Sequence, residues 1–366
     1  MERVLLLTHT DVDGLLPKAT FETLNAVQTA VEGLDQAHFT IGIIGRDVQE
    51  AANRLAGFGA ECIWGVSGPE FEHSRYATDA SAAETICRKA EATLVLAPAT
   101  SRLARILPGV AYRLGGRIDT HATEVAVANG VVRIERWCYR QRMEVRMHRT
   151  HRPWIITTDP GSLKPRRSRP GSVQIEFLSV ETPEVYRRTK TIGVDDPPED
   201  EQTIRSEASL LFVAGAGWTK PQDDGKVHAK RAEGIILDFL KKSRASLGCS
   251  KSLVDIRRDG QPVLSFLTHM NQVGQTGSTP RHPKGLATCC HGEEPHVVGW
   301  RFIDERRAIN LEANCGWAQG KADVLYVADA FEVMAKVNQL LKEESEAPAR
   351  ADAFEDAPLK ECVGAR

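Results

Sequence analysis

The chain has 366 residues, of which 42% are hydrophobic and 26% are charged, and its formal net charge is -2. This length predicts two domains, and the balanced composition excludes a disordered chain and a strongly basic nucleic-acid-binding protein. No apolar run approaches the roughly 18 residues of a membrane-spanning helix, and the run near Met1 is too short for a signal peptide. We therefore expect a cytoplasmic protein with no membrane span.

Residues 1–194 are predicted to form an N-terminal α/β domain. Amphipathic helices alternate with short apolar segments that are typical of buried parallel strands. The apolar segments lie at residues 3–8, 39–45, 61–66 and 93–100. One helix, beginning at Thr20, places Phe21, Leu24 and Val27 on one face. This alternation predicts an open parallel sheet.

The pattern changes from Gly116 to about Thr191 to strands separated by turns, and Asn129 with Gly130 marks a tight hairpin. We therefore expect antiparallel strands to be added to the parallel sheet. Residues 133–169 carry eleven Lys or Arg and three acidic residues. Because the basic residues alternate with apolar ones, they predict solvated strand faces and not a nucleic-acid interface.

A second domain is predicted at residues 205–341, after an acidic, proline-containing linker at residues 195–204. It opens with a strand that runs into a glycine turn at Gly215 and Gly217. These glycines do not complete a nucleotide-binding fingerprint, so a plain tight turn explains them equally well. Strand and helix patterns continue beyond them, and residues 342–366 are expected to form a disordered tail or to lie along a partner.

The eight cysteines are scattered without a repeated spacing, so they predict reduced thiols and not a disulfide framework. Cys289, Cys290, His291 and His296 lie close together, with Cys315 as a spare ligand, and this grouping suggests a metal. Its spacing argues against one, because adjacent cysteines rarely bind one tetrahedral ion together and no paired CxxC motif is present.

Residues 271–280, NQVGQTGSTP, place Gln275 and Thr276 between Gly274 and Gly277. The bare glycine backbone lets a flat or phosphorylated ligand approach closely, while the amide and the hydroxyl can hydrogen-bond to it. A turn with a purely structural role more usually has Asn, Asp or Pro at its centre. This segment therefore predicts a binding site in the second domain.

Other polar residues near predicted strand ends have a structural explanation beside a functional one. Ser250 and Lys251 could face a pyrophosphate, or they could be a helix cap and a surface cation. Asp329 precedes a predicted helix and could simply cap it. Asn310 could be an ordinary residue at a strand end. The sequence pattern alone leaves these alternatives open.

In order and spacing, these segments resemble the alpha subunit of electron transfer flavoproteins, and Val273–Gly277, VGQTG, is the most specific match. The resemblance covers nearly the whole chain. It implies a doubly wound parallel-sheet domain that holds FAD and a heterodimer with a beta subunit. It also implies electron transfer from a flavin-linked dehydrogenase to an acceptor such as a quinone oxidoreductase. The cofactor-binding residues that it implies are Gly215, Gly217, Ser250, Lys251, Val273, Gly274, Gln275, Thr276, Gly277, His291, Gly292, Pro295, His296, Asn310 and Asp329.

The resemblance also assigns parts of the cofactor to some of these residues. Gln275 and Thr276 would lie by the isoalloxazine ring and the ribityl chain. His296 would lie by the pyrimidine edge of the ring. Asn310 and Asp329 would lie along the adenosine half.

Four positions depart from the family's usual pattern. Gly217 and Lys251 stand where members usually carry arginines, His291 replaces a serine, and Pro295 replaces a glutamine. Because a guanidinium beside the flavin would favour negative charge on it, its loss predicts an altered flavin potential. Two alternatives stay open: a scaffolding subunit that has lost the redox function, and a metal-dependent Cys/His enzyme.

Overall fold

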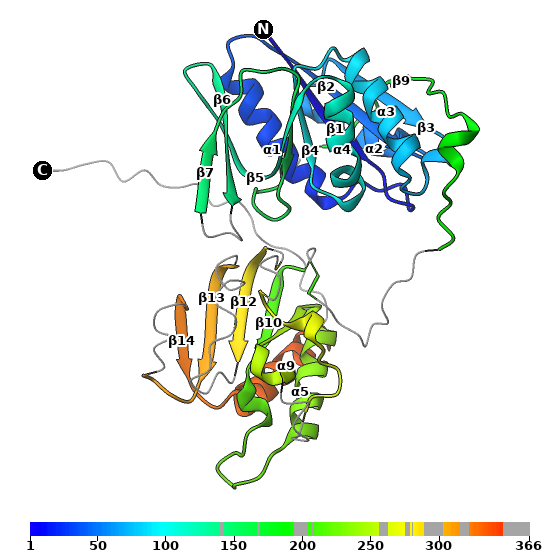
Figure 1. The fold of residues 1–366 in the computed structure, drawn as a ribbon. Coiled ribbons are helices and arrows are strands. Elements are labelled where there is room, and N and C mark those ends of the chain that lie inside the picture. The colour runs from blue at the N-terminus through cyan, green and yellow to red at the C-terminus, as the bar shows by residue number, and fades with distance from the viewer. Residues whose placement is uncertain are drawn as a thin grey trace, which may run out of the picture.

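The computed structural model describes residues 1–138, 143–166, 169–193, 204–205, 208–255, 263–274, 279, 281–288, 303–314 and 322–346. These residues form a nine-stranded sheet in the first half of the chain and a five-stranded sheet in the second half (Figure 1). The predicted domain limits at residues 194, 204 and 341 remain predictions, since residues 194–203 and 347–366 lie outside the described ranges.

The first sheet is mixed. Its strands are β1 (Glu2–His9), β2 (Ala37–Gly45), β3 (Cys62–Ser67), β4 (Leu94–Pro98), β5 (Arg117–Ala128), β6 (Val131–Cys138), β7 (Met143–Met147), β8 (Trp154–Thr158) and β9 (Glu176–Phe177). Their order in space is β7-β6-β5-β8-β4-β1-β2-β3-β9. Strand β6 runs antiparallel to β5 and β7, and the other neighbours pair in parallel. The predicted parallel sheet with added antiparallel strands is confirmed.

The predicted hairpin is also confirmed, because Asn129 and Gly130 connect β5 to β6 with φ of 53° and 71°. Such left-handed values at both central residues match the twist of the flanking strands, and Asn and Gly adopt them most readily.

Helices cover both faces of the first sheet. They are α1 (Lys18–Gly33), α2 (Gln49–Leu55), α3 (Tyr76–Lys89) and α4 (Ser101–Arg113). Side chains alternate between the faces of a strand, so in β1 Leu6 packs with α1 and α2 while Leu5 packs with α3 and α4. The helix expected from Thr20 begins two residues earlier, directly after Pro17.

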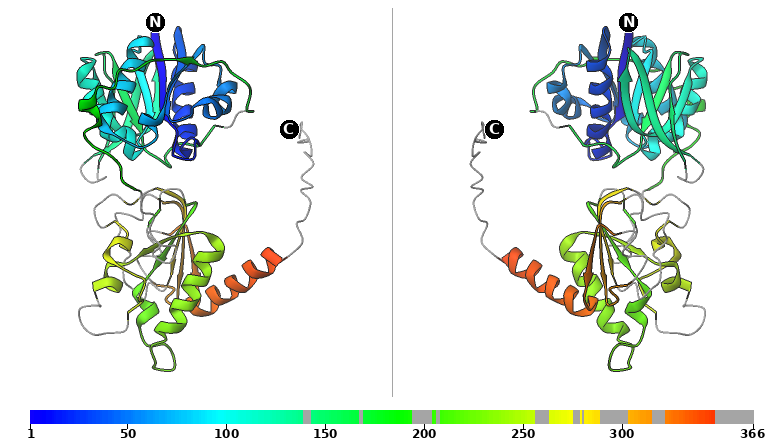
Figure 2. Two further views of the ribbon diagram at one scale, coloured as in Figure 1. Left: turned by 90° about the vertical axis from the view of Figure 1, so that its right-hand side faces the viewer. Right: turned by 90° about the vertical axis from the view of Figure 1, so that its left-hand side faces the viewer.

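The second sheet is entirely parallel. Its strands are β10 (Leu210–Ala214), β11 (Ser246–Cys249), β12 (His282–Thr288), β13 (Ile303–Asn310) and β14 (Val324–Val327), in the order β11-β10-β12-β13-β14. The helices α5 (Ala229–Ser243) and α9 (Ala330–Glu346) pack together on one face, around Ile236 and Met334 (Figure 2). The opposite face carries a smaller cluster that includes Val213 and Val273. This arrangement fits the α/β class predicted for the second half.

Short helices complete the described part of this half: η4 (Ala216–Thr219), α6 (Lys251–Asp255) and η6 (His269–Asn271). Among the described residues, no helix combines the length and the apolar character needed to cross a bilayer. The described cysteines Cys62, Cys87, Cys138 and Cys249 are free thiols, as expected. Burial raises the pKa of Cys87 and of Cys249 to about 12, so both stay protonated at neutral pH.

Candidate functional site

The carboxyl edge of the second sheet gathers predicted site residues from four strands. Gly215 follows β10, Ser250 follows β11, Asn310 ends β13, and Asp329 lies two residues beyond β14. The chain moves from β10 outward to β11 and then returns across β10 to β12, so the strand order reverses there. In open parallel sheets, ligands bind at the carboxyl ends of strands next to such a reversal.

The glycine turn after β10 is tied to the end of β12. The Gly215 N–H donates to the carbonyl of Thr288 at 2.8 Å. Beyond Gly217, the indole N–H of fully buried Trp218 donates to the Thr288 hydroxyl at 2.9 Å. The same indole packs on Phe331 of α9, with ring centroids 4.5 Å apart. Neither Trp218 nor Thr288 was predicted from the sequence, although a tryptophan directly after a glycine turn was a visible signal.

Ser250 and Lys251 lie at the end of β11 but in different environments. Ser250 is 1% exposed, and its N–H donates to the carbonyl of Ala214 at 2.9 Å. Its hydroxyl lies 3.2 Å from that of Ser252. Lys251 is exposed and begins α6, which has five residues. Ser250 therefore belongs to the buried edge of the site, whereas Lys251 faces solvent.

The described start of the VGQTG segment runs beside β11. The Val273 N–H donates to the carbonyl of Cys249 at 3.1 Å. Gly274 has a φ of 76° and donates its N–H to the Thr279 hydroxyl at 2.6 Å. A Cβ atom on Gly248 would lie 2.5 Å from Cγ2 of Val273, so the bare backbone of β11 permits this close approach. The predicted residues outside the described ranges are Gln275, Thr276, Gly277, His291, Gly292, Pro295 and His296.

Asn310 carries an unsatisfied donor at the carboxyl edge. Its side chain is 1% exposed, and Nδ2 has no hydrogen-bond partner in the described part of the chain. Its Oδ1 accepts from the N–H of Glu312 at 3.4 Å. A buried donor without a partner costs about 1–3 kcal/mol.

Asp329 caps helix α9, because its Oδ1 accepts from the N–H of Phe331 at 2.7 Å. Capping was one of the two roles that the sequence left open for Asp329, and this bond shows that Asp329 has it. Asp329 and Asn310 also line one small depression at the ends of β13 and β14. The depression is completed by Gln222, Ile309, Leu311, Ala328 and Ala330.

Gln222 is a lining residue that the sequence pattern did not reveal. Its Nε2 donates to the carbonyls of Gly217 at 3.1 Å and Lys220 at 2.8 Å. It therefore joins the glycine turn to the Asn310 depression. A glutamine in a polar loop carries no motif, so only the folded arrangement identifies it.

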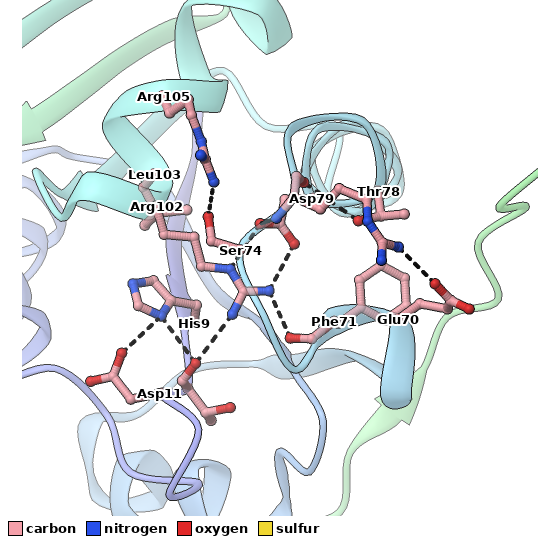
Figure 3. Close-up of polar contacts among 12 residues, drawn as sticks. His9, Asp11, Glu70, Phe71, Ser74, Thr78, Asp79, Arg102, Leu103 and Arg105 are labelled. Atoms are coloured by element: carbon pink, nitrogen blue, oxygen red, sulfur yellow. Dashed lines mark hydrogen bonds and ion pairs between the residues drawn. The ribbon is translucent and has the colours of Figure 1, made fainter. Parts of the chain in front are cut away.

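A second polar cluster lies at the carboxyl edge of the first sheet (Figure 3). Arg102 forms a bidentate ion pair with fully buried Asp79, at 2.9 and 2.7 Å, and also donates to the carbonyls of Thr10 and Phe71. His9 lies beside it, 3% exposed, with Nε2 2.9 Å from the Thr100 hydroxyl.

Burial, together with the positive charge of Arg102, lowers the pKa of His9 to about 4. His9 is therefore neutral near pH 7, and its 3.7 Å approach to Asp11 is not an ion pair there. The charges of Asp79 and Arg102 pair with each other, so this cluster has a structural role: it joins α3 to α4. Within the described residues, no group of three His, Cys, Asp or Glu side chains is arranged to hold a metal ion.

Comparison with known proteins adds a family match. Residues 4–183 match the family model of the electron transfer flavoprotein domain. Protein FixB of Clostridium saccharobutylicum is 25% identical over 337 residues, which cover 90% of this chain and 92% of that protein. The electron transfer flavoprotein subunit alpha of Thermoanaerobacterium thermosaccharolyticum is 25% identical, covering 80% of this chain and 84% of that protein. Both alignments are long enough to extend beyond the first sheet.

Protein FixB of Salmonella typhimurium is 22% identical, covering 75% of this chain and 82% of that protein. Among solved structures, a family 9 glycosyl transferase of Veillonella parvula matches with a TM-score of 0.25 and 11% identity, covering 94% of this chain and 96% of that one. A TM-score this low does not bear on the fold or the function.

Proposed function

Because the chain is a divergent member of the electron transfer flavoprotein family, similar to its alpha subunits, we propose that its second half holds FAD. In this proposal it forms a heterodimer with a beta subunit. It receives electrons from a flavin-linked dehydrogenase and passes them to an acceptor such as a quinone oxidoreductase. Proteins of this family are electron carriers and not enzymes in the usual sense.

The observation that carries the proposal is the buried amide of Asn310, whose Nδ2 has no partner among the described residues. It lies at the edge where Gly215, Ser250 and Asp329 also lie. Within the described residues nothing compensates the cost of burying this donor, and a bound ligand would do so. The edge also adjoins the reversal of strand order, where open parallel sheets bind nucleotides. These residues fit the adenosine half of FAD.

The chain's own residues have distinct tasks in this reading. Asn310 and Asp329 would hold the adenosine half, while the turn at Gly215 and the backbone at Gly274 would let the flavin half approach. The bound FAD supplies the capacity to accept and release electrons. The protein orients the cofactor and sets which of its charge states is favoured. His296, by the resemblance, would stabilise negative charge that develops on the ring.

Gly217 favours a second candidate, a scaffolding subunit that has kept the fold but lost the redox role. Gly217 has no side chain and is buried in η4, so it supplies no cation where relatives usually have an arginine. The two candidates differ in one measurable property, which is whether the heterodimer holds flavin.

The deciding experiment is co-expression of the chain with a beta subunit, followed by an absorbance spectrum of the purified heterodimer. We expect flavin bands and about one FAD bound by this chain per heterodimer. A heterodimer without flavin that also takes up no added FAD contradicts the proposal and supports the scaffold. Elemental analysis of the same sample addresses the metal-dependent alternative, which requires stoichiometric metal.

Variants at Thr276 and His296 give a second measurement on the same sample. If the chain holds FAD, Thr276→Ala and His296→Ala should weaken FAD binding. If it is a scaffold, neither substitution should change a measured FAD affinity. His296→Ala should also lower the flavin potential, because negative charge on the reduced ring would lose a stabilising group. An unchanged potential would remove that role from His296 alone.

A further inference from the structure

An ion pair joins the two halves of the chain close to the VGQTG segment. Arg281 lies directly before β12, and its Nε donates to Oδ2 of Asp159, directly after β8, at 3.3 Å. We propose that Asp159 and Arg281 form a positioning pair, through which the first half of the chain holds the VGQTG segment in place for the flavin. The inference rests on the proposed function and adds a residue of the first half to that site.

Asp159 is fixed by its own neighbours in the first half. Its N–H donates to the carbonyl of Ala122 in β5 at 2.8 Å. Its second carboxylate oxygen, Oδ1, lies 2.9 Å from Nδ1 of His121. The side chains of Asp159 and Arg281 are 23% and 18% exposed, so water screens their attraction less than it screens a fully exposed pair. Asp159 therefore offers Arg281 an ordered and partly buried partner.

The backbones of the two halves also approach each other closely at this point. Gly161 has a φ of 80°, and a Cβ atom on it would lie 3.1 Å from Cβ of Arg281 and 3.3 Å from its carbonyl oxygen. The Gly161 N–H donates to Oε2 of Glu22 at 2.6 Å, which ties this turn to α1. A glycine suits this position because it accepts the positive φ and leaves room for Arg281. Shape as well as charge therefore sets the position of Arg281.

The position of Arg281 reaches the glycine segment over a short length of chain. Two residues before Arg281, the Thr279 hydroxyl accepts from the N–H of Gly274 at 2.6 Å. Gln275 and Thr276 lie between these two residues in the sequence. Because two residues span at most about 7 Å, a shift of Arg281 would strain or move the bond that closes this loop. The pair with Asp159 therefore restrains the base of the loop that would contact the flavin.

The test is a double-mutant cycle on the heterodimer freed of cofactor, with Asp159→Asn, Arg281→Gln and both together. Flavin fluorescence quenching gives the dissociation constant of FAD. Each single variant should bind FAD about fivefold more weakly, and the double variant should be no weaker than either, since the residues share one ion pair. The cycle also cancels the separate contact of Asp159 with His121. Arg281→Lys keeps the charge and should restore most of the affinity that Arg281→Gln loses.

A second measurement needs no flavin. In the cofactor-free heterodimer, amide hydrogen exchange in residues 273–279 should be faster in Asp159→Asn than in the unmodified protein. The matched control is Asp323→Asn, because Asp323 forms an ion pair with Arg306 at 2.8 Å inside the second half. This control removes the same charge and should change neither the FAD affinity nor that exchange.

The outcomes separate the inference from the proposed function. If the unmodified heterodimer takes up no FAD, the proposed function fails, and unchanged exchange in Asp159→Asn would show that the pair does not hold the loop either. If FAD binds but the losses of the two single variants add in the double variant, the inference is wrong while the proposed function stands. The same conclusion follows if Asp323→Asn changes affinity and exchange as much as Asp159→Asn does.

Discussion

The indole N–H of Trp218 donates to the hydroxyl of Thr288 at 2.9 Å, across 70 positions of sequence and inside a fully buried environment. The Thr288 hydroxyl in turn donates to the carbonyl of Val213 at 3.2 Å. This chain of two hydrogen bonds links the turn after β10 to the end of β12. Because the indole also packs on Phe331, it connects that turn to the start of α9.

Replacing Trp218 with Phe should lower the free energy of unfolding by about 1–3 kcal/mol, because an aromatic ring is kept while the N–H bond to Thr288 is lost. Urea denaturation followed by circular dichroism measures the change. The double variant Trp218→Phe with Thr288→Val should cost less than the sum of the single variants, since the two residues share one bond. Strict additivity would show that the bond contributes nothing.

Gly248→Ala should destabilise the second half of the chain, because its new Cβ would lie 2.5 Å from Cγ2 of Val273. Overpacking of this kind costs about 1–3 kcal/mol. Adding Val273→Ala removes the clashing atom, so the double variant should recover part of the stability that Gly248→Ala loses. Thermal unfolding of the three variants tests this; a double variant less stable than Gly248→Ala would contradict the clash.

Asn310→Leu should move stability and FAD binding in opposite directions. Without ligand, the leucine removes a buried donor that has no partner in the described residues, so the unfolding free energy should rise by about 1 kcal/mol. FAD should bind at least about tenfold more weakly, because the pocket loses its donor. Calorimetric titration and denaturation on the same preparation separate the two effects. If Asn310→Leu lowered both the unfolding free energy and the FAD affinity, Asn310 would have a structural role instead.

The pH dependence of stability should carry a contribution from His9. The ordinary histidine pKa is 6.5, and burial lowers the pKa of His9 in the folded chain to about 4. Between these values the unfolded chain binds the proton and the folded chain does not, so stability is full above pH 6.5 and falls as the pH approaches 4. At about pH 5 the loss is about 2 kcal/mol.

The measurement for His9 is urea denaturation at a series of pH values, for the unmodified chain and for His9→Gln. Subtracting one profile from the other cancels most of the carboxyl groups that titrate in both proteins. The unmodified chain should lose more stability than the variant as the pH falls from 7 to 5. Parallel profiles would show that His9 becomes protonated in the folded state without penalty.

Breaking the ion pair between Asp79 and Arg102 should be among the costliest changes in the first half of the chain. Arg102→Met leaves the fully buried carboxylate of Asp79 without its cation, which costs about 3–5 kcal/mol. Asp79→Leu combined with Arg102→Met removes both charges, so the double variant should be more stable than Arg102→Met alone. Denaturation of the four proteins in a double-mutant cycle gives the coupling.

Apolar patterning predicted the parallel strands well, because a strand that is buried on both faces needs a continuous apolar run. Residues 3–8 and 39–45 lie within β1 and β2 as found. Strand β9 was not predicted, since Glu176 and Phe177 are only two exposed residues and show no periodicity. Helix α1 and strand β4 differ from their predicted limits by one or two residues. At these limits the turn residues, and not the apolar residues, determine where the element begins or ends.

The candidate site was predictable only where a motif marked it. Ser250, Asn310 and Asp329 were predicted through their order along the chain, and their binding role stays a prediction. The fold brings the ends of their strands to one edge. Gln222 and Trp218 act through partners that are distant in sequence or belong to the backbone, and such contacts leave no local pattern. The same reason hid the pairing of Asp79 with Arg102, which joins two helices.

The reversal of strand order at β10 means that the groups at the carboxyl edge are supplied by separate segments, from Gly215 to Asp329. Each segment is held by its own strand, so a substitution in one segment leaves the geometry of the other segments unchanged. A substitution at Gly217 or Lys251 should therefore change one segment of this edge and leave the other segments in place. A short peptide cut from this half should not keep the arrangement, because these segments come together only when the whole five-stranded sheet has folded.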